Sequence, residues 1–117
     1  MMLLLWYPKC TTCQRAKAWL DEHGVSCALR DIKEENPGVE ELRAWHQKSG
    51  LPLRRFFNVS GLLYKGLQLK EKLPSMGEEE QYALLAQYGM LVKRPLLVAE
   101  DFVLVGFREA EWSAALL

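Results

Sequence analysis

The order of three features near the N-terminus constrains the fold of this chain more than anything else. An uninterrupted apolar run covers residues 2–7, as expected of a strand buried on both faces in a parallel sheet. The pair Cys10 and Cys13 follows, and residues 11–24 then carry apolar side chains with a helical period and end in glycine. Residues 25–32 predict a second strand. The chain therefore begins with a βαβ unit, whose crossover we expect to be right-handed.

The remainder of the chain predicts further helices and one hairpin. The expected elements are a helix over 38–50, short helices and turns over 51–73, a helix over 78–89, a hairpin over 96–106 and a closing helix over 109–117. This order is that of a thioredoxin-like α/β fold, with a four-stranded mixed sheet, flanking helices and a helical insertion between strands 2 and 3 over about residues 38–90. No repeat or linker divides the chain, so residues 1–117 are predicted to form one domain.

Composition limits the classes of function. The 117 residues carry 15 basic and 15 acidic side chains, so no overall field attracts nucleic acid or an anionic membrane. No apolar run approaches the roughly 18 to 20 residues of a membrane span, and residues 3–7 are too few for a signal peptide. Three cysteines without an export signal favour a reducing compartment. We expect a cytoplasmic, monomeric protein with no direct nucleic-acid or membrane partner.

The position of the cysteine pair predicts redox chemistry. Cys10 precedes the helix, where free backbone N–H groups and the positive end of the helix dipole stabilise a thiolate. Such sites lower a thiol pKa from about 8.5 to roughly 3.5–7.5, and Lys9 and Arg15 add positive charge nearby. Cys10 is therefore the predicted nucleophile. Cys13, one turn later, is the predicted resolving thiol that attacks a mixed disulfide at Cys10.

Two other interpretations of the pair compete with this one. A structural zinc site needs four ligands, and the remaining candidates, Cys27, His23 and His46, form no second pair with a metal-binding spacing. The two cysteines could also be small apolar core residues. A strand, a CxxC pair and a helix in that order favour the redox interpretation over both. Cys27, alone on the second strand, is predicted to fill the core.

Arg94 and Pro95 form a second candidate element directly before the hairpin. In a thioredoxin-like fold a proline at this position begins the third strand, often after a cis peptide bond, and faces the cysteine loop. Arg94 would then direct a fixed positive charge at Cys10 or bind an anionic substrate through its planar guanidinium. The alternatives are a strand-starting proline without further role and a solvated arginine.

Three segments resemble the ArsC/Spx family of thioredoxin-like proteins, and together they span nearly the whole chain. They are YPKCTTCQRAKAWLDEHGV after the first strand, KRPLLV at the third strand and VLVGFREAEW near the end. The resemblance implies a bacterial thiol-disulfide redox protein that holds no bound cofactor and takes electrons from glutathione and glutaredoxin or from thioredoxin. The implied catalytic residues are Cys10, Cys13 and Arg94, and the implied substrate loop contains Lys9, Thr11, Thr12, Asn58 and Pro95.

Within this family, glutathione-coupled arsenate reductases use one cysteine, at the position of Cys10, and three arginines that hold the oxyanion. Arg94 matches one of the three, but Asn58 stands at the position of the second, with Arg54 and Arg55 about one helical turn earlier. These differences count against arsenate reduction, because a tetrahedral dianion needs several converging donors.

The third arginine position falls near Phe107, and Arg108 is one residue away. An offset of one residue beside a strand can turn a side chain away from the site. The substrate is thus predicted to be a small oxyanion or a protein disulfide. The alternative implied by the resemblance is an Spx-like redox-sensing regulator that binds the C-terminal domain of the RNA polymerase α subunit.

Overall fold

A four-stranded mixed sheet forms the centre of the computed structural model, which describes residues 2–117. Its strands are β1 (Met2–Trp6), β2 (Cys27–Asp31), β3 (Leu96–Val98) and β4 (Val103–Val105), in the spatial order β2-β1-β3-β4. β1 pairs in parallel with β2 and antiparallel with β3, and β3 pairs antiparallel with β4. The predicted thioredoxin-like sheet is confirmed.

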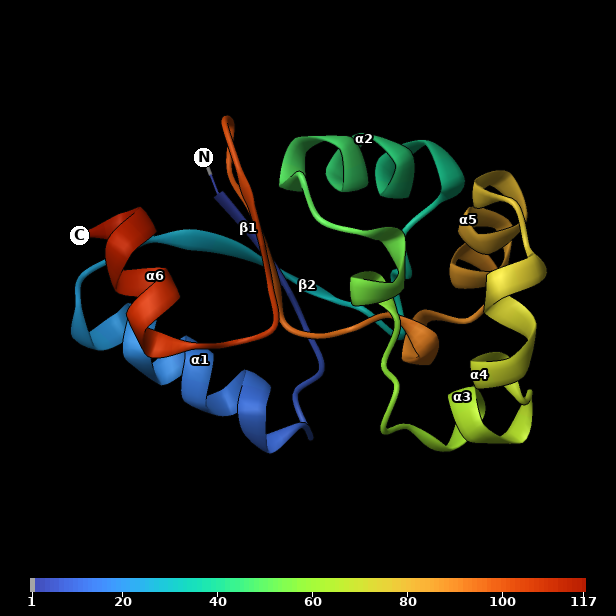
Figure 1. Cartoon of the computed structure of the whole chain (residues 1–117). Helices are drawn as coiled ribbons and strands as arrows, with labels where there is room; N and C mark the ends of the chain where they lie inside the picture. The colour runs from blue at the N-terminus through green and yellow to red at the C-terminus, as the bar shows by residue number, and fades with distance from the viewer. Residues whose placement is uncertain (1) are drawn as a thin grey trace.

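Helices cover both faces of the sheet (Figure 1). On one face lie α1 (Thr11–Glu22) and α6 (Glu109–Leu116). The other face carries the insertion between β2 and β3, which consists of α2 (Val39–Ser49), η1 (Leu53–Phe56), α3 (Leu62–Gly66), α4 (Leu69–Lys72), η2 (Leu73–Ser75), α5 (Glu78–Gln87) and η3 (Gly89–Leu91). The strands and α-helices fall inside the predicted ranges, whereas η2 extends two residues past the predicted range 51–73 and η3 lies mostly beyond the helix predicted over 78–89. Among residues 2–117, no helix is long and apolar enough to cross a membrane.

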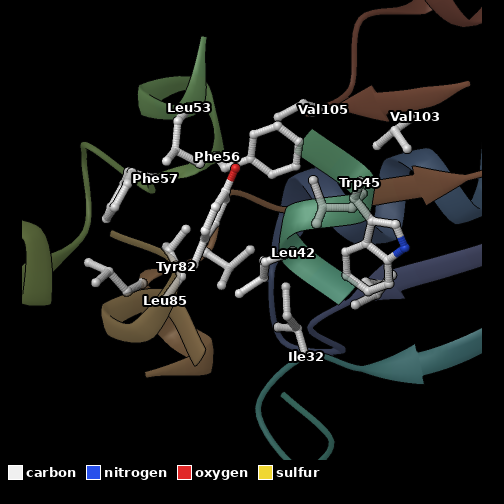
Figure 2. Packing of buried hydrophobic residues seen from close by; sticks show 14 of the residues in the cluster. Ile32, Leu42, Trp45, Leu53, Phe56, Phe57, Tyr82, Leu85, Val103 and Val105 are labelled. Atoms are coloured by element: carbon white, nitrogen blue, oxygen red, sulfur yellow. The ribbon is translucent and has the colours of Figure 1, made fainter. Parts of the chain in front are cut away.

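Successive residues of β1 serve two separate cores, because side chains of a strand alternate between the faces of a sheet. Leu5 points into the larger core, which fills the space between the sheet and the insertion (Figure 2). Trp45 of α2, Phe56 of η1 and Tyr82 of α5 supply its large side chains, and all three are buried. The insertion is therefore held on the sheet by its own apolar residues.

Leu4 points into the smaller core on the opposite face. There it meets Leu20 of α1 and Trp112 of α6, which are both buried. Trp112 faces inward, and its indole Nε1–H donates to the carbonyl of Gly106 at 3.0 Å. Cys27 packs at the edge of this core but is only half-buried, so it fills the core in part.

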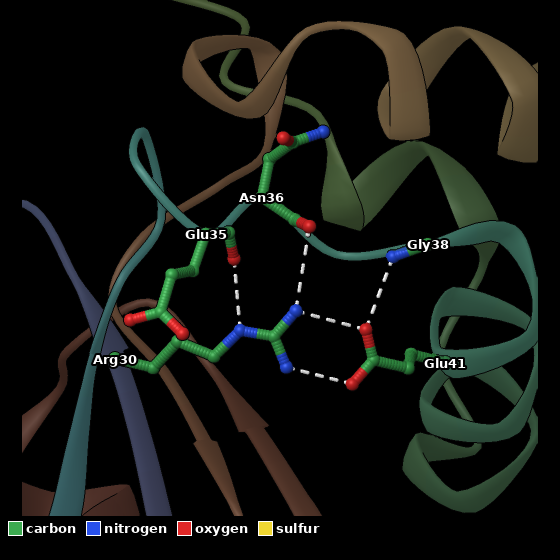
Figure 3. Close-up of polar contacts among 5 residues, drawn as sticks. All are labelled: Arg30, Glu35, Asn36, Gly38 and Glu41. Carbon is green, nitrogen blue, oxygen red and sulfur yellow. Dashed lines mark hydrogen bonds and ion pairs between the residues drawn. The ribbon is translucent and has the colours of Figure 1, made fainter.

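An ion pair connects the edge strand β2 to the first turn of α2 (Figure 3). Arg30 donates from Nη1 and Nη2 to the two carboxylate oxygens of Glu41, at 2.7 and 2.9 Å, and from Nε to the carbonyl of Glu35 at 2.8 Å. Glu41 also accepts the backbone N–H of Gly38 at 3.1 Å. The hydrogen bond from Arg30 is the main reason that the pKa of Glu41 lies below its usual value. This contact fixes the point at which the insertion leaves the sheet.

Gly89 lies where the insertion returns to the sheet, and its backbone comes very close to the segment after β2. A Cβ atom at this position would collide with the carbonyl oxygen of Ile32 and lie 2.7 Å from Cβ of Asn36. The amide of Asn36 donates to the carbonyl of Ala86 in the same region, which holds the two segments together. No side chain fits between them without a backbone shift.

We expect Gly89→Ala to lower the free energy of unfolding by about 1–3 kcal/mol, because overpacking against backbone forces that shift. The matched control is Gly66→Ala, since a Cβ there meets nothing within 4 Å and the change should stay below about 1 kcal/mol. Urea unfolding followed by tryptophan fluorescence measures both. Equal stability of the two variants would contradict the close approach at Gly89.

Candidate active site at the start of the first helix

Cys10 occupies the N-cap position of α1, directly after the turn that leaves β1. Its backbone is extended, with φ −86° and ψ 121°. Its carbonyl accepts the N–H of Gln14 at 3.0 Å, and its own N–H donates to the carbonyl of Tyr7 at 2.9 Å. The side chain of Gln14 closes the turn from outside by donating to the carbonyl of Pro8 at 2.7 Å. The predicted placement of Cys10 at the positive end of the helix is confirmed by this geometry.

The surroundings of Cys10 favour its thiolate. Desolvation by burial acts against the charged form, but hydrogen bonds from the backbone N–H and thiol of Cys13, the charge of Arg94 and the backbone N–H of Thr12 outweigh it. The pKa of Cys10 is therefore lowered. Arg94 is the cation among the main causes that lower the pKa of Cys10, and the predicted cations Lys9 and Arg15 are not among them.

Cys13 has the opposite character. It is fully buried, and the backbone N–H of Tyr7 contacts its Sγ at 3.5 Å. Burial, together with the hydrogen bond to Cys10 and the negative charge there, raises the pKa of Cys13 to about 12. Both thiols are free, and they differ in character, because the pKa of Cys10 is lowered whereas that of Cys13, one turn away, is raised.

Arg94 is held beside Cys10 by backbone and aromatic contacts. Its Nη1 donates to the carbonyl of Met90 at 3.0 Å and lies 3.4 Å from that of Val92, and its Cζ lies 5.7 Å from the ring centre of Tyr7. The buried Nε has no hydrogen-bond partner in residues 2–117. The peptide bond to Pro95 is cis. No carboxylate in the described part of the chain pairs with Arg94, so its charge is left for Cys10 and for a ligand.

A cavity of about 800 Å³ opens above Cys10. Four of the predicted site residues line it: Cys10, Thr12, Asn58 and Arg94. Lys9 and Thr11 are exposed and do not line the cavity, and Pro95 is buried beneath it. The structure thus brings together the nucleophile, one residue of its turn, the arginine and the amide from the insertion.

Three further cations line the same cavity, and sequence analysis left them out of the site: Arg55, Lys93 and Arg108. For Arg108 the expectation that the offset turns the side chain away is wrong. At the second arginine position the sequence has Asn58, but Arg55 lines the cavity as well. Arg54 is exposed and does not line it.

The insertion supplies Arg55 to the cavity because its chain pairs with the segment before β3. Residues 56–58 run beside residues 91–93, with a β-bridge between Phe57 and Val92 and two backbone hydrogen bonds of 2.8 Å. This pairing joins positions far apart in the sequence. Only a prediction of that pairing from the sequence could have placed Arg55 in the site.

A glycine turn directs Arg108 towards the cavity. Gly106 adopts a positive φ of 75°, a conformation that favours glycine. Its N–H donates to the carbonyl of Pro95 at 2.8 Å, and its carbonyl accepts the indole of Trp112. The chain therefore bends sharply at the end of β4, and the two residues that follow, Phe107 and Arg108, both line the cavity.

The charge in this cavity is of one sign. No aspartate or glutamate lines it, and none of its four cations forms an ion pair within residues 2–117. In the same residues no group of three or more His, Cys, Asp or Glu side chains gathers as a metal site requires. The site can therefore hold an anionic group next to a thiol of lowered pKa, a combination suited to disulfide or oxyanion chemistry.

Comparison with known proteins gives consistent matches along the chain. Residues 5–115 match the ArsC family. Two curated relatives come from Bacillus subtilis. The uncharacterized protein YusI is 53% identical over 92% of this chain and 91% of its own length. The global transcriptional regulator Spx is 26% identical over 95% of this chain and 83% of its own length.

Two solved structures are also similar to this chain. The structure of an ArsC family related protein from Bacteroides fragilis has a TM-score of 0.94 and 57% sequence identity, and the match covers 97% of this chain and 95% of that one. The structure of a "possible arsenate reductase" from Streptococcus mutans UA159 has a TM-score of 0.90 and 44% sequence identity, and the match covers 98% of each chain.

We expect alkylation of Cys10 by iodoacetamide to reach half its maximal rate at a pH below that of an ordinary thiol, because the thiolate is the reactive form. In a Cys27→Ser background, Arg94→Gln should raise the pKa of Cys10 and slow alkylation several-fold at pH 7. Arg54→Gln, which removes an arginine outside the cavity, is the control. An unchanged pH profile in Arg94→Gln would show that this charge does not act on Cys10.

Proposed function

Since the chain belongs to the ArsC family, we propose that it is a thiol-disulfide oxidoreductase that uses Cys10 and Cys13. The observation that carries this proposal is the contrast between the two sulfurs. Cys10 borders the cavity with a lowered pKa, and Cys13 is buried behind it with a raised one. Such a division suits a pair in which one thiol attacks the substrate and the other waits.

In the first step the Cys10 thiolate attacks one sulfur of a substrate disulfide. A new bond forms between Cys10 Sγ and that sulfur, the substrate S–S bond breaks, and the second substrate sulfur leaves as a thiolate that takes a proton from solvent. The negative charge on Cys10 is lost in this step. Because that charge is one of the causes of the raised pKa of Cys13, the resolving thiol becomes easier to deprotonate once the mixed disulfide exists.

In the second step Cys13 gives up its proton and attacks Cys10 Sγ. The mixed disulfide breaks, the Cys10–Cys13 disulfide forms, and the released substrate thiolate takes a proton. The substrate has gained two electrons and two protons. The protein pair has lost the two electrons and the proton of Cys13, and solvent has supplied the other proton. An external dithiol or thiol reductant, of the glutaredoxin, glutathione or thioredoxin class, then restores the pair.

The test is trapping of the mixed disulfide. With a low-molecular-weight aromatic disulfide as substrate, we expect the wild-type chain to form a Cys10–Cys13 disulfide and Cys13→Ser to stop at a stable adduct on Cys10, because the resolving sulfur is gone. Intact-protein and peptide mass spectrometry measure both products. Cys27→Ser should behave as wild type. Failure of Cys10→Ser to abolish the reaction would exclude Cys10 as the nucleophile.

Reduction of a small oxyanion such as arsenate is the second candidate function. The specific observation in its favour is that Arg55, Arg94 and Arg108 line one cavity with Cys10, since three arginines can donate to several oxygens of one tetrahedral dianion. In the sequence, only one arginine matches the three arginine positions of arsenate reductases, which counts against this function. In the folded chain, three arginines line one cavity with Cys10, which makes the function worth testing.

A coupled assay measures arsenate-dependent turnover in the presence of glutathione with glutaredoxin, or of thioredoxin. If arsenate is a substrate, turnover should require Cys10 and fall by roughly ten- to a thousand-fold in Arg94→Gln, as expected for loss of a charge-stabilising donor. Arg54→Gln should retain it. Absence of turnover with either reductant system would leave disulfide reduction as the function of the site.

The resemblance also raised a regulatory function, in which the Cys10–Cys13 disulfide switches binding to the C-terminal domain of the RNA polymerase α subunit. Its support comes from the relatives named as global transcriptional regulators, at lower sequence identity than the reductase-like structures. We place it behind the two reductase functions, because the cationic cavity beside Cys10 is a feature of a substrate site.

A further inference from the structure

Three exposed apolar side chains lie in residues 59–63, at or next to the cavity lining, and the packing of residues 2–117 leaves them open to solvent. Val59 is 52% exposed, Leu62 89% and Leu63 36%, and the two leucines line the cavity. We call Val59, Leu62 and Leu63 the apolar lip. A group of exposed apolar side chains beside a reactive thiol is a feature typical of an interaction site.

The apolar lip is not needed to hold α3 on the protein. Tyr64 packs edge-on against the buried ring of Phe57, with ring centres 6.4 Å apart, and Leu67 also packs on the larger core. These two residues face inward and dock the helix. Leu62 and Leu63 consequently project away from the core, and their exposure serves no packing purpose within the chain.

The loop that carries the lip is held in place. Gly61 N–H donates to the carbonyl of Asn58 at 3.1 Å, and the Ser60 hydroxyl donates to the Asn58 side chain at 3.3 Å. Asn58 is in turn anchored to the segment before β3, through its N–H and the carbonyl of Leu91. The lip thus stands in a fixed relation to the four cations of the cavity, Arg55, Lys93, Arg94 and Arg108, which we call the cationic wall.

We propose that this surface binds an acidic peptide segment with apolar side chains, and that the disulfide reduced at Cys10 is carried by a protein in such a segment. The proposal rests on the function proposed above and names its substrate class. Carboxylates beside the disulfide meet the cationic wall, which holds no acidic side chain. An apolar side chain of the same segment covers Leu62. A small oxyanion could satisfy the wall, but it would leave the lip in water.

The reaction follows the same two steps, with the same balance of electrons and protons, as the proposed disulfide reduction. Cys10 Sγ forms a bond to one sulfur of the peptide disulfide, the partner sulfur leaves and is protonated, and Cys13 then releases the peptide as a dithiol. Two electrons pass from the Cys10–Cys13 pair to the peptide disulfide. An external dithiol returns the pair to its reduced form, and in the experiment dithiothreitol does this before the reaction and is then removed.

The experiment compares reduction rates of three fluorogenic peptides that contain the same internal disulfide, flanked by Asp and Leu, by Ser alone, or by Lys and Leu. Pre-reduced full-length protein is mixed with each in single turnover, beside 2-hydroxyethyl disulfide as a substrate without charge or side chains. We expect the Asp/Leu peptide to react roughly tenfold faster than the Lys/Leu peptide at low ionic strength. The difference should shrink as salt screens the cationic wall.

Matched variants test whether the cationic wall and the apolar lip affect the reduction rate specifically, or whether any surface substitution lowers it. Arg55→Gln and Leu62→Ser should each lower the Asp/Leu rate several-fold. Arg54→Gln, on the neighbouring arginine outside the cavity, and Leu117→Ser, on a terminal leucine that is 66% exposed, should leave it unchanged. Equal effects in Leu62→Ser and Leu117→Ser would overturn the lip as part of the binding surface.

The outcomes distinguish the proposed acidic-peptide substrate from the thiol-disulfide function on which it rests. Reduction of 2-hydroxyethyl disulfide with equal rates for the three peptides would overturn the acidic-peptide substrate and leave the redox function standing. Faster reduction of glutathione disulfide than of the Asp/Leu peptide would assign the cationic wall to a small anionic disulfide and likewise overturn the proposal. No reduction of any disulfide would overturn both.

Discussion

The antiparallel pairing of β1 with β3 is the contact on which the site depends. β1 ends where the cysteine turn begins, and β3 starts two residues after Arg94, so antiparallel pairing brings these two ends together. The register places Leu5 opposite Leu96, and its continuation brings Tyr7 and Arg94 together. The guanidinium accordingly lies over the Tyr7 ring, and the backbone of Tyr7 contacts both cysteines. One strand pair therefore places Cys10, Cys13 and the positive charge of Arg94 close together.

Burial and charge act on the two sulfurs in opposite ways. Both thiols lose solvent, which disfavours their thiolates, but Cys10 receives backbone N–H groups and the field of Arg94 in return. For Cys13, burial prevails over the backbone N–H of Tyr7 and the charge of Arg94, and the hydrogen bond to Cys10 and its negative charge raise the pKa further. The same four-residue motif thus contains one thiol with a lowered pKa and one with a raised pKa. The cationic wall extends this field into the cavity, where no carboxylate opposes it.

Sequence reasoning succeeded wherever the determining contacts are local. The strand over residues 2–6 follows from its apolar run, the helix from Thr11 follows from its period, and Cys10 at the helix start follows from both. It failed for the cations that complete the cavity. Arg55 enters through the pairing of residues 56–58 with residues 91–93, and Arg108 through the turn at Gly106 and its bond to Trp112. These contacts join distant segments and leave no periodic pattern in the sequence.

By itself, then, the sequence determined the order of the elements and the location of the cysteine pair at the start of a helix, because helix and strand periods act over a few residues. From the helix dipole it also predicted Cys10 as the nucleophile. Tertiary structure decided what surrounds that pair. The choice of Arg55 over Arg54 and the exposure of Leu62 depend on how the insertion packs against the sheet. The inclusion of Arg108 depends on the turn at Gly106 after β4. Substrate recognition belongs to this second group, since it requires charges and apolar side chains from segments that meet only in the folded chain.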